Sequence, residues 1–145
     1  DGPSDADESM YTKPADAVDF YEKTNVDSLA IAIGTVHGVY RGTPKLDLAR
    51  LDAIRLALPN VPLALHGGSG LSDAAFRSAV EHGINKINFF TGMSLAASKA
   101  AAEFIRAREG QTAELHYHDI NAVAHKRAKT VVQDAISTFG TLPLL

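Results

Sequence analysis

The architecture is set by two stretches of sequence, LAIAIG at residues 29–34 and VPLALHGGSG at residues 61–70. Each begins with a short, continuous apolar run, and a glycine follows close behind it. Such a run is typical of a β-strand that is buried on both faces, as in a parallel sheet. A third run, KINFF, occupies residues 86–90. We therefore predict three buried strands, over residues 29–33, 61–65 and 86–90.

Helices are predicted before, between and after these strands. Pro14 suits the first turn of a helix, and Asn25 suits its end. Ser72 is a good N-cap and Gly83 a good C′ residue for the helix between the second and third strands. We expect Asp119 to be the N-cap of the last helix. The predicted helices cover residues 14–23, 46–58, 72–82, 93–108 and 119–139.

The alternation of strand and helix predicts an α/β fold with right-handed βαβ units. Three parallel strands make a poor complete sheet, because the outer two expose apolar edges. Two continuations are open: a doubly wound sheet, or a (β/α)8 barrel of which this chain is a part. We expect a whole protein of about 280–350 residues. Both folds place function at the carboxyl ends of the strands.

Composition narrows the class of protein. The 145 residues include 14 Lys and Arg, 17 Asp and Glu, and no Cys, with a formal net charge of −3. A nucleic-acid surface is not predicted, and disulfides, thiolate nucleophiles and cysteine metal ligands are excluded. No apolar run approaches the ~20 residues that cross a bilayer. We predict a cytoplasmic protein without nucleic-acid or membrane partners.

Two histidines are the first candidates for chemistry. His37 lies in GTVHG, just past the first strand, and His66 directly follows the second. Two neutral imidazoles at the same end of neighbouring strands suit a shared Zn²⁺ or similar divalent ion. A catalytic site needs a third protein ligand, which no residue here obviously provides. The alternative for His37 alone is a histidine that caps a turn.

The segment HGGSG at residues 66–70 is the second candidate, because its glycines expose backbone N–H groups just before a helix begins. Gly67, Gly68 and Ser69 are therefore predicted to bind an anion such as phosphate. At the end of the third strand, Asn88 and Thr91 are candidates to hydrogen-bond substrate oxygens. The alternative for residues 66–70 is a flexible loop without a ligand, and the alternative for Asn88 and Thr91 is capping of the strand end. A histidine-rich segment at residues 116–119 is attributed to the start of the last helix.

Three motifs, taken together in this order and at this spacing, form a specific signature of one protein family. They are DSLAIAIGTVHGVY at 27–40, LHGGSG at 65–70 and KIN at 86–88. They resemble the C-terminal half of the class II (zinc-dependent) ketose-bisphosphate aldolases. The resemblance implies the last three strand-helix units of a (β/α)8 TIM barrel. Residues 1–12 would then be a mobile loop, 13–110 the barrel units and 111–145 a C-terminal helical extension. It also implies a homodimer or homotetramer.

The resemblance also implies roles for individual residues. His37 and His66 match zinc ligands of the family, and one catalytic Zn²⁺ is expected. Gly38, Gly67 and Ser69 match positions that bind a substrate phosphate and a monovalent cation. Asn88 matches a contact to the reacting carbon skeleton, and Thr91 a phosphate contact. The acid/base aspartate of the family precedes this region, so no catalytic residue is assigned.

The reaction implied is reversible aldol cleavage of a ketose 1,6-bisphosphate to dihydroxyacetone phosphate and an aldehyde. Phe90 stands where fructose-bisphosphate aldolases typically carry an aspartate, a departure that tagatose-bisphosphate aldolases share. We therefore predict altered recognition of the aldehyde half, with tagatose 1,6-bisphosphate preferred to fructose 1,6-bisphosphate. The alternative is a non-catalytic phosphate-binding or assembly protein that retains the barrel.

Overall fold

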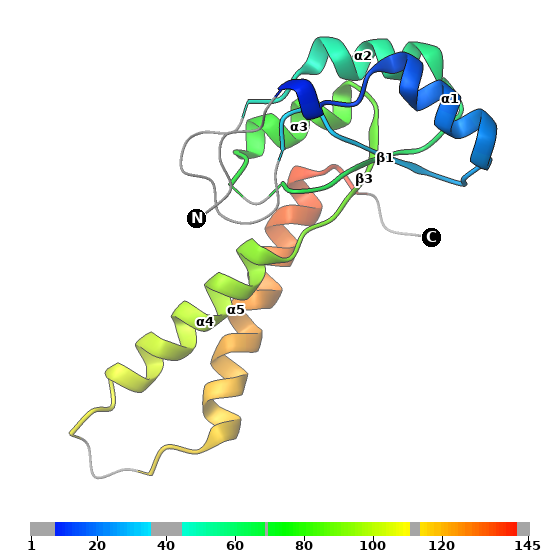
Figure 1. The fold of residues 1–145 in the computed structure, drawn as a ribbon. Helices are drawn as coiled ribbons and strands as arrows, with labels where there is room; N and C mark the ends of the chain where they lie inside the picture. Colours follow the sequence, from blue (N-terminus) through cyan, green and yellow to red (C-terminus); the bar gives the residue numbers. More distant parts are fainter. Residues whose placement is uncertain (1–7, 36–44, 69, 111–113, 142–145) are drawn as a thin grey trace. The chain divides into compact units, whose positions relative to one another are not determined.

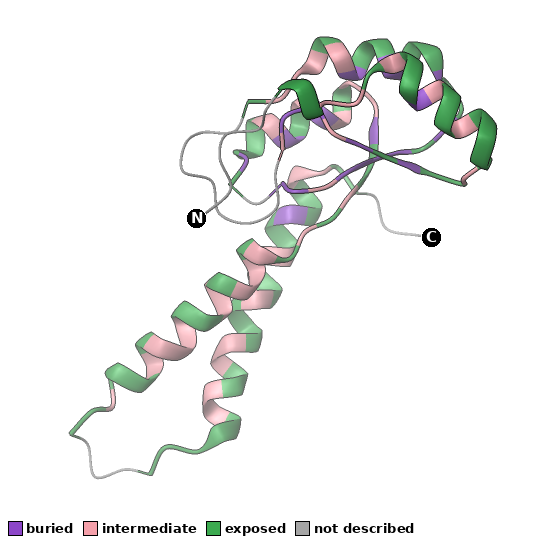
Figure 2. Cartoon of the chain, in the orientation of Figure 1, coloured by how far each residue is buried: buried purple, intermediate pink, exposed green. Residues whose placement is uncertain are grey.

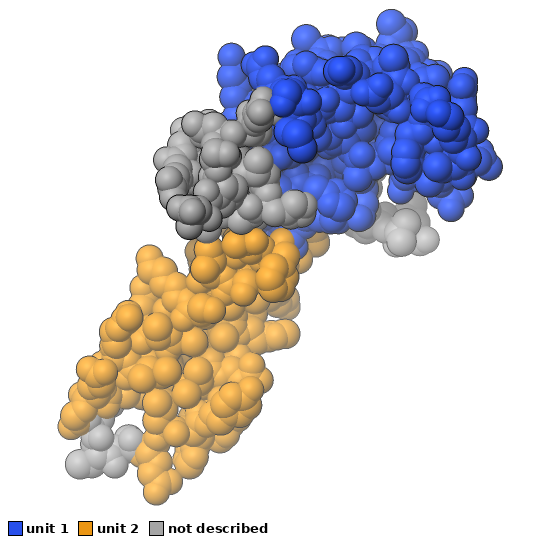
Figure 3. Space-filling model, in the orientation of Figure 1, with its two compact units in different colours: residues 1–89 blue, residues 90–145 orange. Residues whose placement is uncertain are grey.

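The computed structural model describes residues 8–35, 45–68, 70–110 and 114–141. The chain divides into two compact units, Asp1–Phe89 and Phe90–Leu145 (Figure 3). The first unit contains the sheet and its covering helices, and the second contains two long helices.

A three-stranded parallel sheet forms the centre of the first unit, in the order β1-β2-β3 (Figure 1). Leu29 of β1 lies opposite Leu63 of β2, which lies opposite Ile84 of β3. The three predicted strands are confirmed, but each is shorter than expected, and the third begins two residues earlier. The strands are β1 Leu29–Ile31, β2 Leu63–Leu65 and β3 Ile84–Ile87.

Burial differs between the strands. Every residue of the central strand β2 is buried, as its apolar run predicts. The expectation of burial on both faces is wrong for the outer strands: Ala30 of β1 is exposed, and in β3 only Ile84 is buried. The reason is position, because among the described strands only β2 has a neighbour on both edges.

Helices cover the sheet of the first unit. α1 packs against β1 and α2, and α3 packs against β3 (Figure 1). Figure 2 shows buried residues on the strands and on the helices. The largest fully buried side chains are Ile33, Leu51, Ile54, Leu63 and Leu65. The helical elements are η1 Glu8–Met10 (a 3-10 helix), α1 Pro14–Thr24, α2 Leu48–Ala57 and α3 Asp73–Glu81.

The ends of these helices follow local signals in the sequence. α1 ends at Asn25 in the left-handed conformation (φ 49°), and Gly83, with φ 107°, follows the end of α3. Ser72 caps α3 as predicted. At α2 the carboxylate of Asp47 accepts hydrogen bonds from the backbone N–H and the guanidinium of Arg50, both at 2.9 Å. These bonds hold the pKa of the Asp47 carboxyl below its ordinary value.

The segment before α1 is paired with the chain beyond β1. Thr12 donates its N–H to the Ala32 carbonyl at 2.8 Å, and its hydroxyl oxygen accepts from the Ala32 N–H at 2.8 Å. The described part of the expected loop, residues 8–12, therefore contains a short 3-10 helix and a residue paired with Ala32. The reason is that the backbone groups of Ala32 need partners, which Thr12 supplies. Residues 1–7 of that loop lie outside the described residues.

The second unit is a pair of helices, α4 Thr91–Arg106 and α5 Tyr117–Thr138, which pack against each other (Figure 1). Both begin two residues earlier than predicted. The N-cap of α5 is His116, so the prediction of Asp119 as the cap is wrong. Asp119 instead lies in the first turn, where its carboxylate complements the helix dipole. Within these two helices only Ala135 is buried.

Candidate functional site

His66 and Asn88 meet at the carboxyl ends of β2 and β3. Each residue directly follows its strand, and because the strands are parallel both lie at the same edge of the sheet. The Asn88 N–H donates to the Leu65 carbonyl at 3.2 Å, which continues the pairing past β3. The Asn88 side-chain amide nitrogen lies 3.0 Å from His66 Nε2. The structure thus brings together two of the residues predicted from the sequence.

Thr35 adds a contact from the neighbouring strand. It follows β1, and its hydroxyl donates a hydrogen bond to the His66 carbonyl at 2.6 Å. The turn before it uses Gly34 at φ 108°, packed against the Lys45 carbonyl, where a side chain would collide. Sequence reasoning missed Thr35, because a hydroxyl-to-carbonyl bond between distant residues leaves no sequence pattern. His66 is therefore contacted from both neighbouring strand ends.

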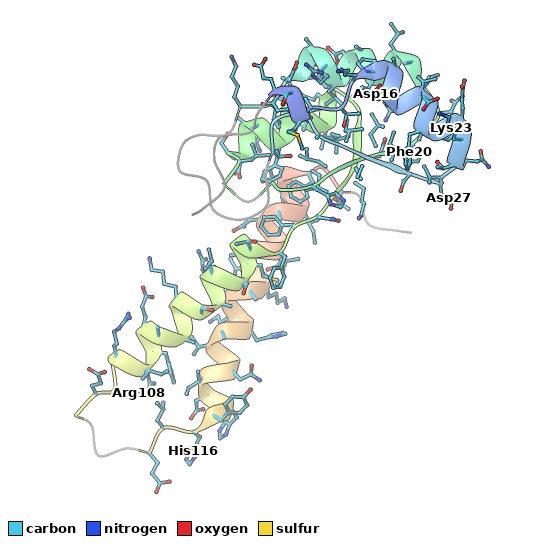
Figure 4. All side chains as sticks on the ribbon, viewed as in Figure 1. Asp16, Phe20, Lys23, Asp27, Arg108 and His116 are labelled. Atoms are coloured by element: carbon cyan, nitrogen blue, oxygen red, sulfur yellow. The ribbon has the colours of Figure 1, made fainter. Side chains whose placement is uncertain are left out.

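A pocket of about 300 Å³ opens beside His66. It is lined by Thr12, Ala30, Ile31, Ala32, Thr35 and His66. A larger pocket of about 480 Å³ lies between α1 and β1, where Asp16 and Phe20 belong to its wall (Figure 4). None of the residues that line the larger pocket was predicted to carry chemistry. The smaller pocket is the one that contains a candidate ligand side chain.

The loop after β2 has two buried glycines. Gly67 has a φ of 67°, which favours glycine, and its neighbour Gly68 is packed against Phe76. A Cβ atom at position 68 would lie 2.9 Å from Phe76 Cε1. Packing alone therefore explains the glycine at 68, so it is weaker support for phosphate binding than Gly67. The N-terminus of α3 itself carries the acidic Asp73, which disfavours an anion there.

The remaining predicted site residues are not part of this arrangement as described. His37, Gly38 and Ser69 lie outside the described residues. Thr91 is the first residue of α4 and belongs to the second unit. Phe90, which occupies the N-cap position of α4, is 68% exposed.

The described residues include a side chain of the type that binds metal ions, but they do not make a complete metal site. The imidazole of His66 is a ligand type that Zn²⁺ prefers. Across residues 8–35, 45–68, 70–110 and 114–141, no three His, Cys, Asp or Glu side chains are grouped to hold a metal ion. The rings of His116 and His118 stack at the start of α5, with their centroids 5.3 Å apart, without forming such a group. His66 is thus not part of a group of three such side chains within the described ranges.

Comparison with known families decides the relationship. Residues 1–142 match the family model described as "Fructose-bisphosphate aldolase class-II". The chain belongs to the class-II fructose-bisphosphate aldolase family. The resemblance inferred from the three sequence motifs is therefore confirmed.

Solved structures confirm the fold of this aldolase-family chain. The YdjI aldolase from Escherichia coli K12 is 37% identical, with a TM-score of 0.77 over 90% of this chain and 46% of that one. The fructose-bisphosphate aldolase Fba from Campylobacter jejuni is 19% identical, with a TM-score of 0.75 over 92% of this chain and 46% of that one. The chain thus spans about half the length of these structures. Its fold is part of a (β/α)8 barrel, as predicted.

Proposed function

We propose that the protein containing this aldolase-family chain cleaves a ketose 1,6-bisphosphate reversibly to dihydroxyacetone phosphate and an aldehyde. The observation that carries the proposal is the position of His66, at the carboxyl end of β2 and 3.0 Å from the Asn88 amide. Barrel enzymes of this fold work at that end of their strands. Family membership supports the same reaction class.

In this proposal His66 and His37 hold one divalent ion, Zn²⁺. When bound, such an ion supplies Lewis-acid stabilisation of negative charge that develops on substrate oxygens. Asn88 hydrogen-bonds an oxygen on the substrate's carbon skeleton, since beyond the contact with His66 its amide has one N–H donor and its oxygen acceptor to spare. No residue of this chain is assigned to the proton transfers. We assign them to a carboxylate in the part of the protein that precedes this chain.

Phosphate binding is proposed for backbone N–H groups of Gly38 and Gly67, with Ser69 and Thr91 adding hydroxyl donors. Gly68 was predicted with them, and its N–H remains a candidate. A monovalent cation beside the same loop is part of the proposal. Held at one phosphate, the substrate presents its reacting carbons in a fixed orientation, which lowers the entropic cost of reaction.

The proposal includes a homodimeric or homotetrameric protein in the cytoplasm. Over the part of the chain that the structure describes, no helix is both long and apolar enough to cross a membrane. The substrate is a phosphorylated sugar in solution, and neither nucleic acid nor membrane is a proposed partner.

The metal dependence of the reaction is the first prediction. The full-length protein should release dihydroxyacetone phosphate from a ketose 1,6-bisphosphate, lose this activity after exhaustive treatment with a chelator, and regain it with Zn²⁺. The measurement is NADH consumption coupled through glycerol-3-phosphate dehydrogenase. Full activity after chelation, with metal removal verified by elemental analysis, contradicts the proposal.

A second candidate function is a phosphate-binding or assembly protein without turnover. It is the alternative that the sequence leaves open, because no residue of this chain is assigned the acid/base role. It predicts that the full-length protein binds inorganic phosphate in calorimetry yet releases no dihydroxyacetone phosphate, with or without added Zn²⁺.

The preferred ketose is the second prediction. Phe90 cannot accept the hydrogen bonds that an aspartate would, so tagatose 1,6-bisphosphate should have the higher kcat/KM. The contrast should be about 10–200-fold. F90D should shift the ratio toward fructose 1,6-bisphosphate, and the fold should tolerate it because aspartate is a good N-cap for α4. F90L, which stays apolar, is the control.

The measurement is kcat/KM for both bisphosphates on the wild type and the two variants. A clear preference of the wild type for fructose 1,6-bisphosphate, unchanged in F90D, would show that Phe90 does not select the substrate.

A further inference from the structure

The candidate ligand His66 is held at two separate points. Its backbone carbonyl accepts the Thr35 hydroxyl at 2.6 Å, and its ring nitrogen Nε2 lies 3.0 Å from the Asn88 amide. One contact comes from the chain after β1 and the other from the chain after β3. The residue on the central strand is therefore fixed from both sides.

The bond from Thr35 acts on the backbone of His66. It is short, part-buried and links residues 31 positions apart in the sequence. The His66 carbonyl lies where regular strand pairing ends, since β2 stops at Leu65. A buried or half-buried carbonyl needs a partner, and here the partner is a side chain. The bond therefore sets the direction in which the chain, and with it the imidazole, leaves the strand.

The contact from Asn88 acts on the ring. A histidine that binds a metal through one ring nitrogen is usually oriented by a hydrogen bond at the other. With its nitrogen toward Nε2, as in the structure, the Asn88 amide donates to an unprotonated Nε2. Turned over, it presents Oδ1, which accepts from Nε2–H and leaves Nδ1 for the metal. The Asn88 backbone is itself fixed by the bond from its N–H to the Leu65 carbonyl. The Asn88 side chain therefore extends toward the ring from a backbone that is paired with β2.

We infer that Thr35 and Asn88 are positioning residues that hold His66 in the orientation needed to bind a divalent metal. The inference rests on the proposed function, because it takes His66 as a metal ligand. It goes beyond that function in assigning a role to Thr35 and a second role to Asn88. Losing one such supporting contact typically weakens metal binding about 10–100-fold.

The experiment measures Zn²⁺ affinity of the full-length protein without substrate, by competition with a chromophoric chelator. T35V removes the hydroxyl and keeps the shape of the side chain, and we expect a Kd about 10–100-fold weaker. T35S restores the hydroxyl and should recover most of the loss. N88A should also weaken Zn²⁺ binding, although a residue that contacted only substrate would leave it unchanged. The absorption of the Co²⁺-loaded protein should shift in T35V and N88A.

T24V is the matched control. Thr24 makes the same type of bond, from its hydroxyl to the Phe20 carbonyl at 2.7 Å, at the end of α1. Its removal should leave the Zn²⁺ Kd and the Co²⁺ spectrum unchanged. Circular dichroism of every variant shows whether the fold is kept.

The outcomes separate the inference from the proposed function. If H66A abolishes Zn²⁺ binding while T35V and N88A bind like the wild type, the positioning role is wrong and the metal site stands. If T35S fails to recover affinity, the hydroxyl bond is not the cause, and the role of Thr35 is wrong. If H66A binds Zn²⁺ like the wild type, the metal site itself fails, and the positioning role with it.

Discussion

Arg55 connects several backbone segments at the end of the sheet opposite His66. One guanidinium nitrogen, Nη1, donates to the carbonyls of Leu58, Pro59 and Val61 at 3.0–3.2 Å. The other, Nη2, donates at 2.7 Å to the Gly83 carbonyl and to Asn85 Oδ1. Asn85 Oδ1 also accepts the Leu63 N–H. These contacts lie where β2 and β3 begin, so their role is structural.

The residue-scale prediction concerns the stability that Arg55 supplies. R55A leaves several carbonyls without a charged donor, and we expect a loss of about 2–3 kcal/mol in the free energy of unfolding. R55K should recover only part of the lost stability, because one ammonium group cannot reproduce the hydrogen bonds of the planar guanidinium. R77A, at an exposed position on α3, should change stability by less than about 0.5 kcal/mol.

Urea denaturation of the full-length protein followed by circular dichroism measures these differences. The kcat/KM of the folded R55A enzyme should match the wild type, because Arg55 lies at the opposite ends of the strands from His66. An R55A variant as stable as R77A would show that the guanidinium contacts do not hold the strand ends together.

Individual site residues were predictable only where a pattern marks them. His66 directly follows an apolar run, and Asn88 was expected at the end of the third strand, so their placement at one edge of a parallel sheet followed from the sequence, and their roles stay predictions. Thr35 and Arg55 were not predictable. Thr35 bonds the carbonyl of His66, and Arg55 bonds mainly backbone carbonyls, both near it in sequence and at Gly83. Every residue has a backbone carbonyl, so the sequence does not mark which one a side chain will bond.

At the scale of elements, the apolar runs located the strands and helical periodicity located the helices. The third strand was placed too late because Phe89 and Phe90 extend its apolar run. In the structure Ile84 pairs with Leu63, the last backbone bond to β2 comes from Asn88, and α4 begins at Thr91. Apolar character therefore continued past the point where backbone pairing stopped.

The helix boundaries show the same limit. Side-chain capping marked the start of α3 correctly at Ser72, because its hydroxyl accepts the Ala75 N–H at 3.2 Å. The caps of α4 and α5, Phe90 and His116, make no capping hydrogen bond with their side chains. A helix that begins without such a cap gives no local signal for its first residue.

At the scale of the whole molecule, the described sheet has three strands and the chain spans 46% of the Escherichia coli YdjI aldolase. The motifs located this chain in the family because they follow successive strands of one barrel. The apolar composition of the outer strands predicted further strands but left two folds open, a doubly wound sheet and a (β/α)8 barrel. Both folds are built from the same βαβ units. The comparison with solved structures removed that alternative.

The most direct test of the proposed metal-dependent cleavage is the activity of H66A in the full-length protein. We expect kcat for release of dihydroxyacetone phosphate to fall at least about 1000-fold, or about 4 kcal/mol in the barrier, without recovery at higher substrate concentration. H118A, which removes an exposed histidine near the start of α5, is the control and should keep full activity. A folded H66A protein that cleaves ketose bisphosphate at the wild-type rate would contradict the account.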